Sequence, residues 1–255
     1  MKLMLSLVLL LFVTTTAFAE EELRAPPTLR DAAKAHFHNG LAFYRSEHET
    51  LVEMESLRSG RRHFPAKRTI YREGEIAAEM LVIFDGWAFR YKLLPGGRRQ
   101  ILSFLLPGDP ICLPLLTVDR LPFSVQSLTS VTACGFERRC FADFVADHRQ
   151  IAHQADVFCV NAQTSADERL IDLGRRSAYE RVGRLILELV TRMEAKGIAT
   201  GNPMFFPLGQ THIADALGLT SIHAGRVLRR FRRDGVLSLH RGRLDLFDRA
   251  ALKRL

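Results

Sequence analysis

The sequence lacks the cysteine and histidine spacings that hold metal ions. It contains no Cys-x-x-Cys pair and no Cys/His cluster, and its four cysteines are Cys112, Cys134, Cys140 and Cys159. A tetrahedral zinc site or an iron–sulfur cluster therefore has no ligand set, and we expect reduced, buried thiols. A nucleophile elbow, a phosphate-binding loop and a metal-spaced histidine pair are also missing. We therefore expect no metal, no cofactor and no catalytic residue, and an enzyme is the least supported class.

Charge is distributed unevenly along the 255 residues, although the composition is that of a globular protein, with 47% apolar, 25% charged and 9% aromatic residues. The net charge is +8. Residues 175–255 hold 16 basic and 7 acidic residues, a net charge of +9, so the other 174 residues have a net charge of −1. This asymmetry predicts a polyanion-binding module joined to a neutral body. A solvated basic surface is the alternative.

Residues 1–19 have the pattern of a secretory signal. Lys2 precedes an apolar run over residues 3–13, and residues 17–19 form an Ala-x-Ala exit. The run is too short for a comfortable membrane span, so we expect no membrane partner. A start codon assigned too far upstream would produce the same pattern, with Met54 as one downstream start. Residues 20–62 predict a mostly helical, polar extension in which Leu51, Met54 and Leu57 stand at i, i+3 and i+6.

Residues 63–140 predict a small antiparallel sandwich or jelly roll. Short apolar, β-branched and aromatic runs alternate with turn signals about every ten to twelve residues. Because an Asp-Gly pair favours the tight turn of a hairpin, we expect the strands on either side of Asp85-Gly86 to pair with each other. The other turn signals are Glu73-Gly74, Pro95-Gly96-Gly97 and Pro107-Gly108-Asp109.

Residues 141–174 predict one long helix that links two domains. No glycine or proline interrupts residues 141–173. Apolar side chains recur every three or four residues, at Ile151, Ala155, Phe158, Ala162, Ala166, Leu170 and Leu173. We expect this face to pair with its twin in a homodimer, because a helix that links two domains has more apolar surface than one neighbour covers. Packing on the sandwich is the alternative.

Residues 175–255 predict a winged helix-turn-helix. A helix over residues 178–194 is followed by a short helix that ends at Gly218, since glycine adopts the left-handed conformation of a tight helix exit. The inward side chains of the short helix are Ile213, Ala214 and Leu217. Thr220 is placed to cap a second helix, whose inward side chains are Ala224, Val227, Leu228 and Phe231. Two short runs around Arg241-Gly242 then predict a hairpin wing.

The outward face of that second helix is basic. At 100° per residue, its members fall within about 60° of one another: Ile222, Arg226, Arg229 and Arg233. Arginine forms bidentate hydrogen bonds with guanine and neutralises phosphates. We predict that Arg226 reads bases, that Ile222 contacts a thymine methyl, and that the other arginines bind phosphates. The predicted DNA-binding residues are Gln210, Thr220, Ser221, Ile222, His223, Arg226, Arg229, Arg230 and Arg233. A protein-docking winged helix is the alternative.

Taken together, these features resemble the cyclic-AMP receptor/Fnr (Crp/Fnr) family of bacterial transcription regulators. The resemblance covers about residues 55–255. It rests on Tyr71-Arg72-Glu73-Gly74-Glu75, Asp85-Gly86, Pro107-Gly108-Asp109, Ile213-Ala214-Asp215-Ala216-Leu217-Gly218-Leu219-Thr220, Gly225-Arg226-Val227-Leu228 and Arg233-Asp234-Gly235-Val236-Leu237. It implies an α+β fold with an N-terminal antiparallel jelly roll of the cyclic-nucleotide-binding type, a long dimerisation helix and a C-terminal winged helix-turn-helix. It also implies a homodimer that binds a two-fold symmetric site on double-stranded DNA, with RNA polymerase as a further partner.

The sequence departs from the family where cyclic AMP would bind. Members that bind cyclic AMP carry Gly-Glu after the Pro-Gly-Asp turn and Arg-Ser about ten residues later. The matching residues here are Leu113-Pro114 and Phe123-Ser124, and a cyclic phosphate without that arginine is poorly compensated. We therefore expect that the effector pocket does not bind cyclic AMP conventionally, although Arg120 lies nearby. The candidate pocket residues are Leu113, Pro114, Arg120, Phe123 and Ser124, and the sequence does not identify the effector.

A DNA-binding regulator implies a cytoplasmic protein, which conflicts with the signal-like residues 1–19. The alternative function is an exported or cytosolic small-ligand-binding sensor module in which DNA binding is secondary or lost. Ile222 stands where many relatives carry a glutamate on the recognition helix, so we expect a different DNA sequence preference. The sequence identifies neither the target genes nor whether the protein activates or represses them.

Overall fold

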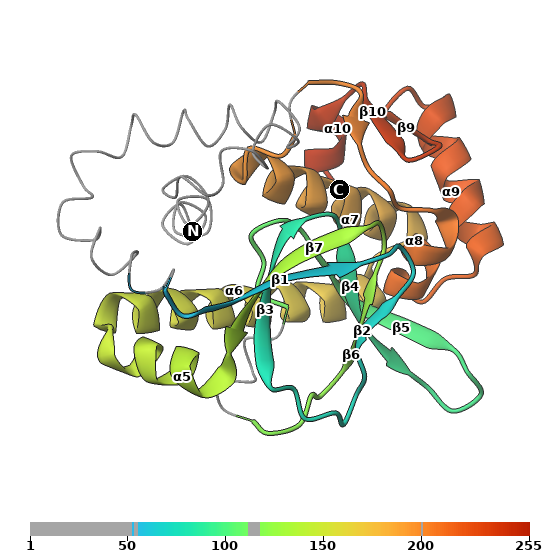
Figure 1. Ribbon diagram of the computed structural model, residues 1–255. Coiled ribbons are helices and arrows are strands. Elements are labelled where there is room, and N and C mark those ends of the chain that lie inside the picture. Colours follow the sequence, from blue (N-terminus) through green and yellow to red (C-terminus); the bar gives the residue numbers. More distant parts are fainter. Residues whose placement is uncertain (1–52, 54–55, 112–117, 200) are drawn as a thin grey trace, which may run out of the picture.

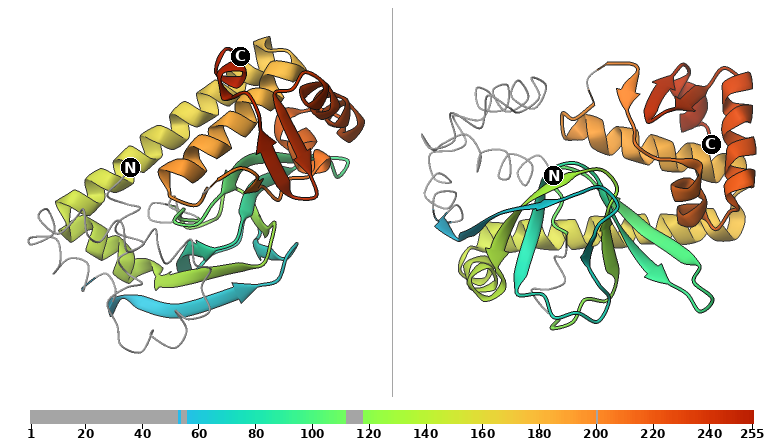
Figure 2. Two further views of the ribbon diagram at one scale, coloured as in Figure 1. Left: turned by 90° about the horizontal axis from the view of Figure 1, so that it is seen from above. Right: turned by 45° about the vertical axis from the view of Figure 1, so that its right-hand side comes forward.

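The computed structural model describes residue 53 and residues 56–111, 118–199 and 201–255. It has an α+β fold in which a β-sandwich lies beside a helical C-terminal part, with the long helix α6 (Arg149–Arg175) running along both (Figures 1 and 2). The signal-like residues 1–19 and the predicted extension up to residue 52 lie outside the described residues. None of the described helices combines the length and the apolar character needed to cross a membrane.

Two antiparallel sheets form the N-terminal part. The first has the strand order β1 (Arg58–Phe64), β7 (Val131–Glu137) and β3 (Glu79–Asp85). The second has the order β2 (Thr69–Tyr71), β6 (Ser124–Ser127), β4 (Ala88–Leu93) and β5 (Arg99–Leu105). Their shared core contains Leu81, Ile83, Ala88, Leu105, Val125 and Ala133. The predicted jelly-roll-like sandwich is therefore confirmed.

The predicted helical extension over residues 20–62 is wrong at its C-terminal end. Residues 58–62 belong to β1, which pairs with β7 from Arg58↔Phe136 to Phe64↔Val131. β1 is an edge strand, and none of its side chains is fully buried. Its polar sequence therefore shows no alternation of apolar and polar residues, and the strand depends on backbone pairing with a segment some 70 residues away.

The prediction that the strands flanking Asp85-Gly86 pair with each other is also wrong. β3 pairs with β7, whereas β4 pairs with β5 and β6. Gly86 therefore carries the chain from one sheet to the other. Its φ is 88°, and a Cβ on it would lie 2.0 Å from the carbonyl oxygen of Ser130. The chain bends at Gly86, but backbone partners far away in the sequence determine which strands this bend connects.

The predicted single helix over residues 141–174 is two helices, α5 (Arg138–Asp147) and α6. They meet at His148, whose φ of −112° and ψ of 91° are extended. The His148 ring lies 4.3 Å from the Phe144 ring, centroid to centroid. This break allows α5 to bury Phe141 and Phe144 against the first sheet beside Phe136, while α6 continues in its own direction. Contact with the sheet, which local periodicity does not report, decides the break.

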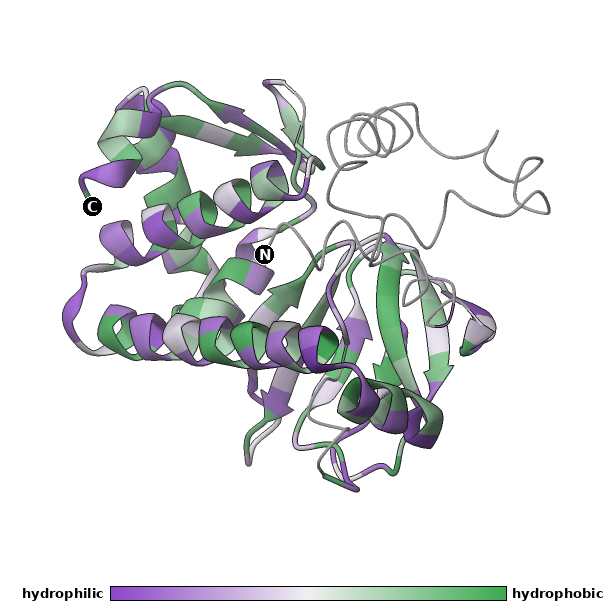
Figure 3. Ribbon diagram, turned by 90° about the vertical axis from the view of Figure 1, so that its left-hand side faces the viewer, coloured by the Kyte–Doolittle hydropathy of each residue, from purple (hydrophilic) through white to green (hydrophobic). Residues whose placement is uncertain are grey.

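The apolar face predicted for the long helix divides into a covered and an uncovered part. Ile151 is buried, and Ala155 and Phe158 pack on the cluster formed by α5 and the first sheet. Further along α6, Val160, Leu170, Ile171 and Leu173 are exposed, and Figure 3 shows hydrophobic residues on the open side of this helix. The expectation that the thiols are buried is correct for Cys134. It is wrong for Cys140 of α5 and Cys159 of α6, which are exposed.

The C-terminal part confirms the predicted winged helix-turn-helix. Its helices are α7 (Ala178–Ala195), α8 (Gln210–Leu217), α9 (Ser221–Arg233) and α10 (Arg249–Lys253). Its antiparallel sheet has the order β8 (Met204–Phe205), β10 (Arg243–Leu246) and β9 (Leu237–His240). The β9–β10 hairpin turns at Arg241-Gly242 as predicted. Sequence periodicity predicted neither β8 nor α10, because two and five residues are too few to show a period.

Gly86→Ala is expected to destabilise the sandwich by about 3 kcal/mol or more, because the methyl group adds a backbone clash to the strain of a left-handed conformation. Gly96 is the matched control. Its φ is also 88°, but nothing lies within 4 Å of a Cβ there, so Gly96→Ala should cost only about 1–2 kcal/mol. Urea denaturation measures both losses, and equal losses would contradict the role assigned to Gly86.

Candidate nucleic-acid interface

The turn between α8 and α9 is closed by local hydrogen bonds. Gly218 ends α8 with a left-handed φ of 62° and ψ of 35°. The backbone N–H of Leu219 then donates to the carbonyl oxygen of Ala214 at 3.1 Å. Thr220 caps α9 as predicted, because its Oγ1 accepts the backbone N–H of His223 at 3.1 Å. Both helix ends at this turn are thus satisfied by neighbours in the sequence.

Close packing determines which way α9 faces. A Cβ on Gly225 would lie 2.6 Å from Oε1 of Gln210, so the missing side chain brings α9 against the start of α8. The Phe231 ring stacks on Tyr179 of α7, with the centroids 3.9 Å apart. The inward residues are buried as predicted, namely Ala224, Val227, Leu228 and Phe231. The orientation of α9 therefore follows from its contacts with α7 and α8.

The opposite face of α9 is open to solvent, and Figure 2 shows this helix at the outer edge of the molecule. Ile222 keeps 67% of its surface exposed. Arg226 and Arg229 are exposed, and neither has a side-chain partner in the part of the chain that the structure describes. All nine predicted DNA-binding residues are exposed: Gln210, Thr220, Ser221, Ile222, His223, Arg226, Arg229, Arg230 and Arg233. Contact of these residues with DNA stays a prediction.

Two of the predicted phosphate contacts already have protein partners. The guanidinium of Arg230 lies 4.4 Å from the centre of the Tyr179 ring, and its Nε lies 3.4 Å from Oδ2 of Asp234. Nε of Arg233 lies 3.4 Å from Oδ1 of the same carboxylate. Exposed pairs of this kind contribute less than about 1 kcal/mol, so a phosphate can displace them. Arg226 and Arg229 have no such partner among the described residues, so no carboxylate there offsets their charges.

The candidate effector residues are in different environments. Phe123 belongs to the sandwich core, and Ser124 is buried with its Oγ accepting the backbone N–H of Glu73 at 3.0 Å. Arg120 is exposed and donates from Nη1 to the carbonyl oxygen of Gly74 at 2.9 Å. Leu113 and Pro114 lie outside the described residues. Phe123 is thus a core side chain, which suits packing rather than anion binding.

Sequence reasoning missed a cation beside Phe123. The guanidinium of Arg90 on β4 lies 4.8 Å from the centre of the Phe123 ring, and its Nε donates to Oγ of Ser103 at 2.7 Å. Arg90 stands between Phe89 and Tyr91, both buried. A charged residue inside such an apolar strand needs a polar partner. The place of Arg90 between two aromatic residues could therefore have pointed to this contact from the sequence.

Polar contacts that the sequence did not single out join the sandwich to the C-terminal part. Asp109 is buried beside Arg192 and Lys196, with Oδ2 2.6 Å from Nη2 of Arg192 and Oδ1 2.8 Å from Nζ of Lys196. Burial raises the pKa of Asp109, but the two cations outweigh it and hold that pKa below its ordinary value. Elsewhere in the interface, Arg99 of β5 pairs with Asp215 of α8 at 2.7 Å.

Comparison with known proteins decides the family. Residues 180–255 match the model of the Crp-like helix-turn-helix domain, and residues 61–148 match that of the cyclic nucleotide-binding domain. The chain is 34% identical over 207 residues to the nitrogen fixation regulation protein FixK of Bradyrhizobium diazoefficiens, covering 80% of this chain and 85% of that protein. The chain belongs to the Crp/Fnr family. Among other relatives, the transcriptional activatory protein AadR of Rhodopseudomonas palustris is 33% identical over 75% of this chain and 77% of its own length.

The solved structure of FixK2 from Bradyrhizobium japonicum superposes with a TM-score of 0.70 at 26% identity, covering 77% of this chain and 96% of that one. Crp/Fnr members are transcription regulators rather than enzymes, and the family binds DNA as dimers. The chain is therefore a DNA-binding transcription regulator of the Crp/Fnr type. This result favours the regulator over a sensor module in which DNA binding is secondary or lost.

His212 of α8 contacts the sandwich through its imidazole ring. Its Nδ1 accepts the backbone N–H of Gly209 at 3.1 Å, and the ring centroid lies 5.9 Å from that of Phe89. Burial, followed by the charge of Arg99, lowers the pKa of His212. The unfolded chain therefore binds this proton more readily than the folded protein. The stability that His212 contributes is present above about pH 6.5 and is lost as the pH falls below that value.

We expect the free energy of unfolding in urea to fall between about pH 7.5 and about pH 5.5, and to fall less in His212→Gln, which keeps an acceptor for Gly209. His223→Gln, at an exposed position on α9, should retain the pH dependence of the wild type. If His212→Gln and the wild type lose the same stability over this range, His212 is not the titrating group.

Proposed function

We propose that the protein binds a two-fold symmetric DNA site as a homodimer and inserts one α9 into the major groove of each half-site. The observation that carries this proposal is the outward face of α9, where Ile222, Arg226, Arg229 and Arg233 are all exposed opposite a buried stripe. Half-sites about one helical turn apart suit two such helices. A cytoplasmic location and contact with RNA polymerase belong to the proposal, and the name of AadR as a transcriptional activatory protein supports the latter.

The residues of α9 divide the work of recognition by position. Arg226 lies between Ile222 and Arg229 along the helix and can place two N–H groups on guanine O6 and N7. Ile222, one turn earlier, offers an apolar contact to a thymine methyl. Thr220, Ser221 and His223 surround the helix start, where backbone N–H groups and the helix dipole favour a phosphate. Arg229 and Arg233 extend the basic face along the groove.

Arg226→Ala is expected to weaken binding to the specific site by about 1–3 kcal/mol, because a base contact is lost. Fluorescence anisotropy would measure this on a duplex that the wild-type protein selects from a random pool. Lys253→Ala removes the same charge from an exposed position on α10 and should leave that affinity nearly unchanged. If the two substitutions weaken binding equally, Arg226 contributes only its positive charge and does not contact a base.

The exposed apolar side chains of α6 support dimerisation through this helix. Val160 and Ile171 are 64% and 46% exposed and lie about 20° apart on the helical wheel. Val160→Glu is expected to raise the dimer dissociation constant at least about 100-fold, because an unpaired carboxylate would be buried in the seam. Ser165→Glu, about 140° around the helix, is the control. Sedimentation velocity distinguishes the species, and a fully dimeric Val160→Glu protein would rule out this seam.

We infer that the sensor does not bind cyclic AMP in the family's usual way, because Phe123 is a core residue where an arginine would hold the cyclic phosphate. Titration calorimetry with cyclic AMP is expected to show no saturable binding up to about 1 mM. Saturation in the micromolar range would show that another cation, such as Arg90 or Arg120, holds the phosphate instead.

A further inference from the structure

The Pro107-Gly108-Asp109 turn of the sandwich is bound by the end of α7. Besides Asp109, Arg192 donates from Nη1 to the carbonyl oxygen of Phe104 at 3.1 Å, and Lys196 donates to the carbonyl oxygen of Pro107 at 3.0 Å. Each cation therefore binds a carboxylate oxygen of Asp109 and one backbone oxygen, which belongs to the turn for Lys196 and to β5 for Arg192.

Both carboxylate oxygens of Asp109 are engaged in this contact. Oδ2 also accepts the backbone N–H of Leu106 at 2.8 Å, so the carboxylate closes its own turn while it binds both cations. Only 4% of the residue is exposed. Because the Asp109 carboxylate is desolvated, removing its cations leaves a buried charge uncompensated. A small displacement of α7 from the turn is therefore costly.

α7 transmits this constraint to the recognition helix. Tyr179 at the start of α7 stacks on Phe231 of α9, and Gly183 leaves room for the same ring. The contact between Arg99 and Asp215, with Gln100 donating to the carbonyl oxygen of Ala216 at 3.1 Å, holds α8 to β5. The sandwich thus binds the C-terminal part at two places, the end of α7 and the helix α8, and neither contact involves the outward face of α9.

We propose that Asp109 is a positioning residue for DNA binding, which through Arg192 and Lys196 fixes the direction of α9 relative to the sandwich and α6. This inference rests on the proposed symmetric binding of a dimer. In such a dimer the direction of α9 in each protomer determines the distance and rotation between the two recognition helices. The Asp109 contact therefore sets the half-site spacing that the protein accepts, whereas Arg226 reads the sequence within each half-site.

The test compares spacing selectivity in Asp109→Asn and in the double variant Arg192→Gln/Lys196→Gln with the wild type. Asparagine keeps an acceptor for the backbone N–H of Leu106, and the double variant leaves the sequence of the turn unchanged. The probes are the duplex selected by the wild-type protein, the same duplex with one base pair inserted between the half-sites, and a duplex with a single half-site. One inserted base pair turns one half-site by roughly 35° and moves it by roughly 3.4 Å.

We expect the wild type to prefer the selected spacing, and both variants to lose about tenfold of that preference, within the usual range of coupling between sites. Binding to the single half-site should be unchanged, which a general loss of folding would not allow. Asp119→Asn is the matched control, because Asp119 also lies in the sandwich but pairs with Arg138 of α5; it should keep the wild-type preference.

Three outcomes would overturn the inference in distinguishable ways. If both variants keep the wild-type spacing preference, Asp109 holds the turn without positioning α9. If the wild type itself selects no symmetric duplex, or ignores the inserted base pair, the proposed dimeric binding fails first, and the role of Asp109 fails with it. A rise in affinity for the selected duplex in both variants would show that the contact restrains DNA binding rather than positioning α9 for it.

Discussion

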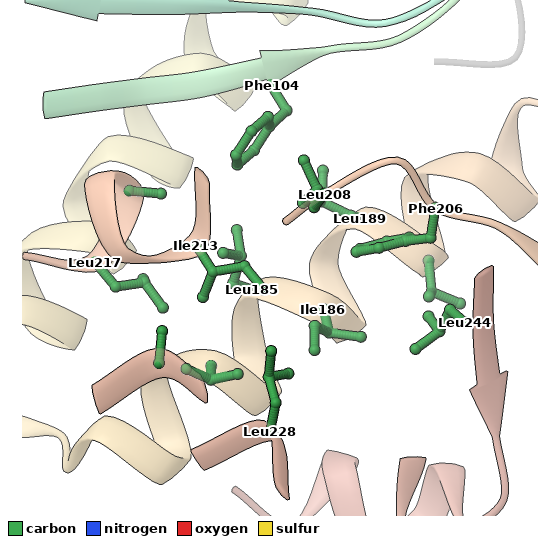
Figure 4. Packing of buried hydrophobic residues seen from close by; sticks show 14 of the residues in the cluster. Phe104, Leu185, Ile186, Leu189, Phe206, Leu208, Ile213, Leu217, Leu228 and Leu244 are labelled. Atoms are coloured by element: carbon green, nitrogen blue, oxygen red, sulfur yellow. The ribbon is translucent and has the colours of Figure 1, made fainter. Parts of the chain in front are cut away.

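One apolar core holds the recognition helix to both parts of the molecule, and the rest of the structure is arranged around it. Leu185 and Leu189 of α7 meet Ile213 of α8 and Leu228 of α9, and Phe104 enters the same cluster from β5 of the sandwich (Figure 4). Each such side chain contributes about 1.5–3 kcal/mol when it is fully buried. Because this core crosses from the sandwich to the helix-turn-helix, the two parts are packed as one body rather than joined only by α6.

Polar contacts at the edges of this core define the orientation of α7. The bend between α6 and α7 is held by Asp172, a buried carboxylate that binds Arg176 at 2.6 Å and Arg184 at 3.1 Å. The far end of α7 is held by Asp109. Apolar contacts tolerate sliding, whereas charge-assisted hydrogen bonds require a particular geometry. The apolar core attaches α9 to α7, and the ion pairs at the two ends of α7 define the orientation of α7.

The basic surface of α9 follows from the same packing. The buried stripe uses every apolar side chain of α9 except Ile222, so the arginines are left on the outward face. Asp234, just past the end of the helix, pairs with Arg230 and Arg233. The charge near Arg226 and Arg229 thus remains available to a polyanion, which agrees with the concentration of positive charge in residues 175–255.

Features with local causes could be predicted from the amino-acid pattern alone. The helix-turn-helix could be predicted almost residue by residue, because Gly218, Thr220 and the apolar spacing of α8 and α9 act within a few positions of one another. Other features depend on tertiary contacts: the pairing of β1 with β7, the crossing at Gly86, the break at His148, and the burial of Asp109 between Arg192 and Lys196. In each case the partner lies in a distant segment or in a packed surface, and neither spacing nor composition records which surfaces meet.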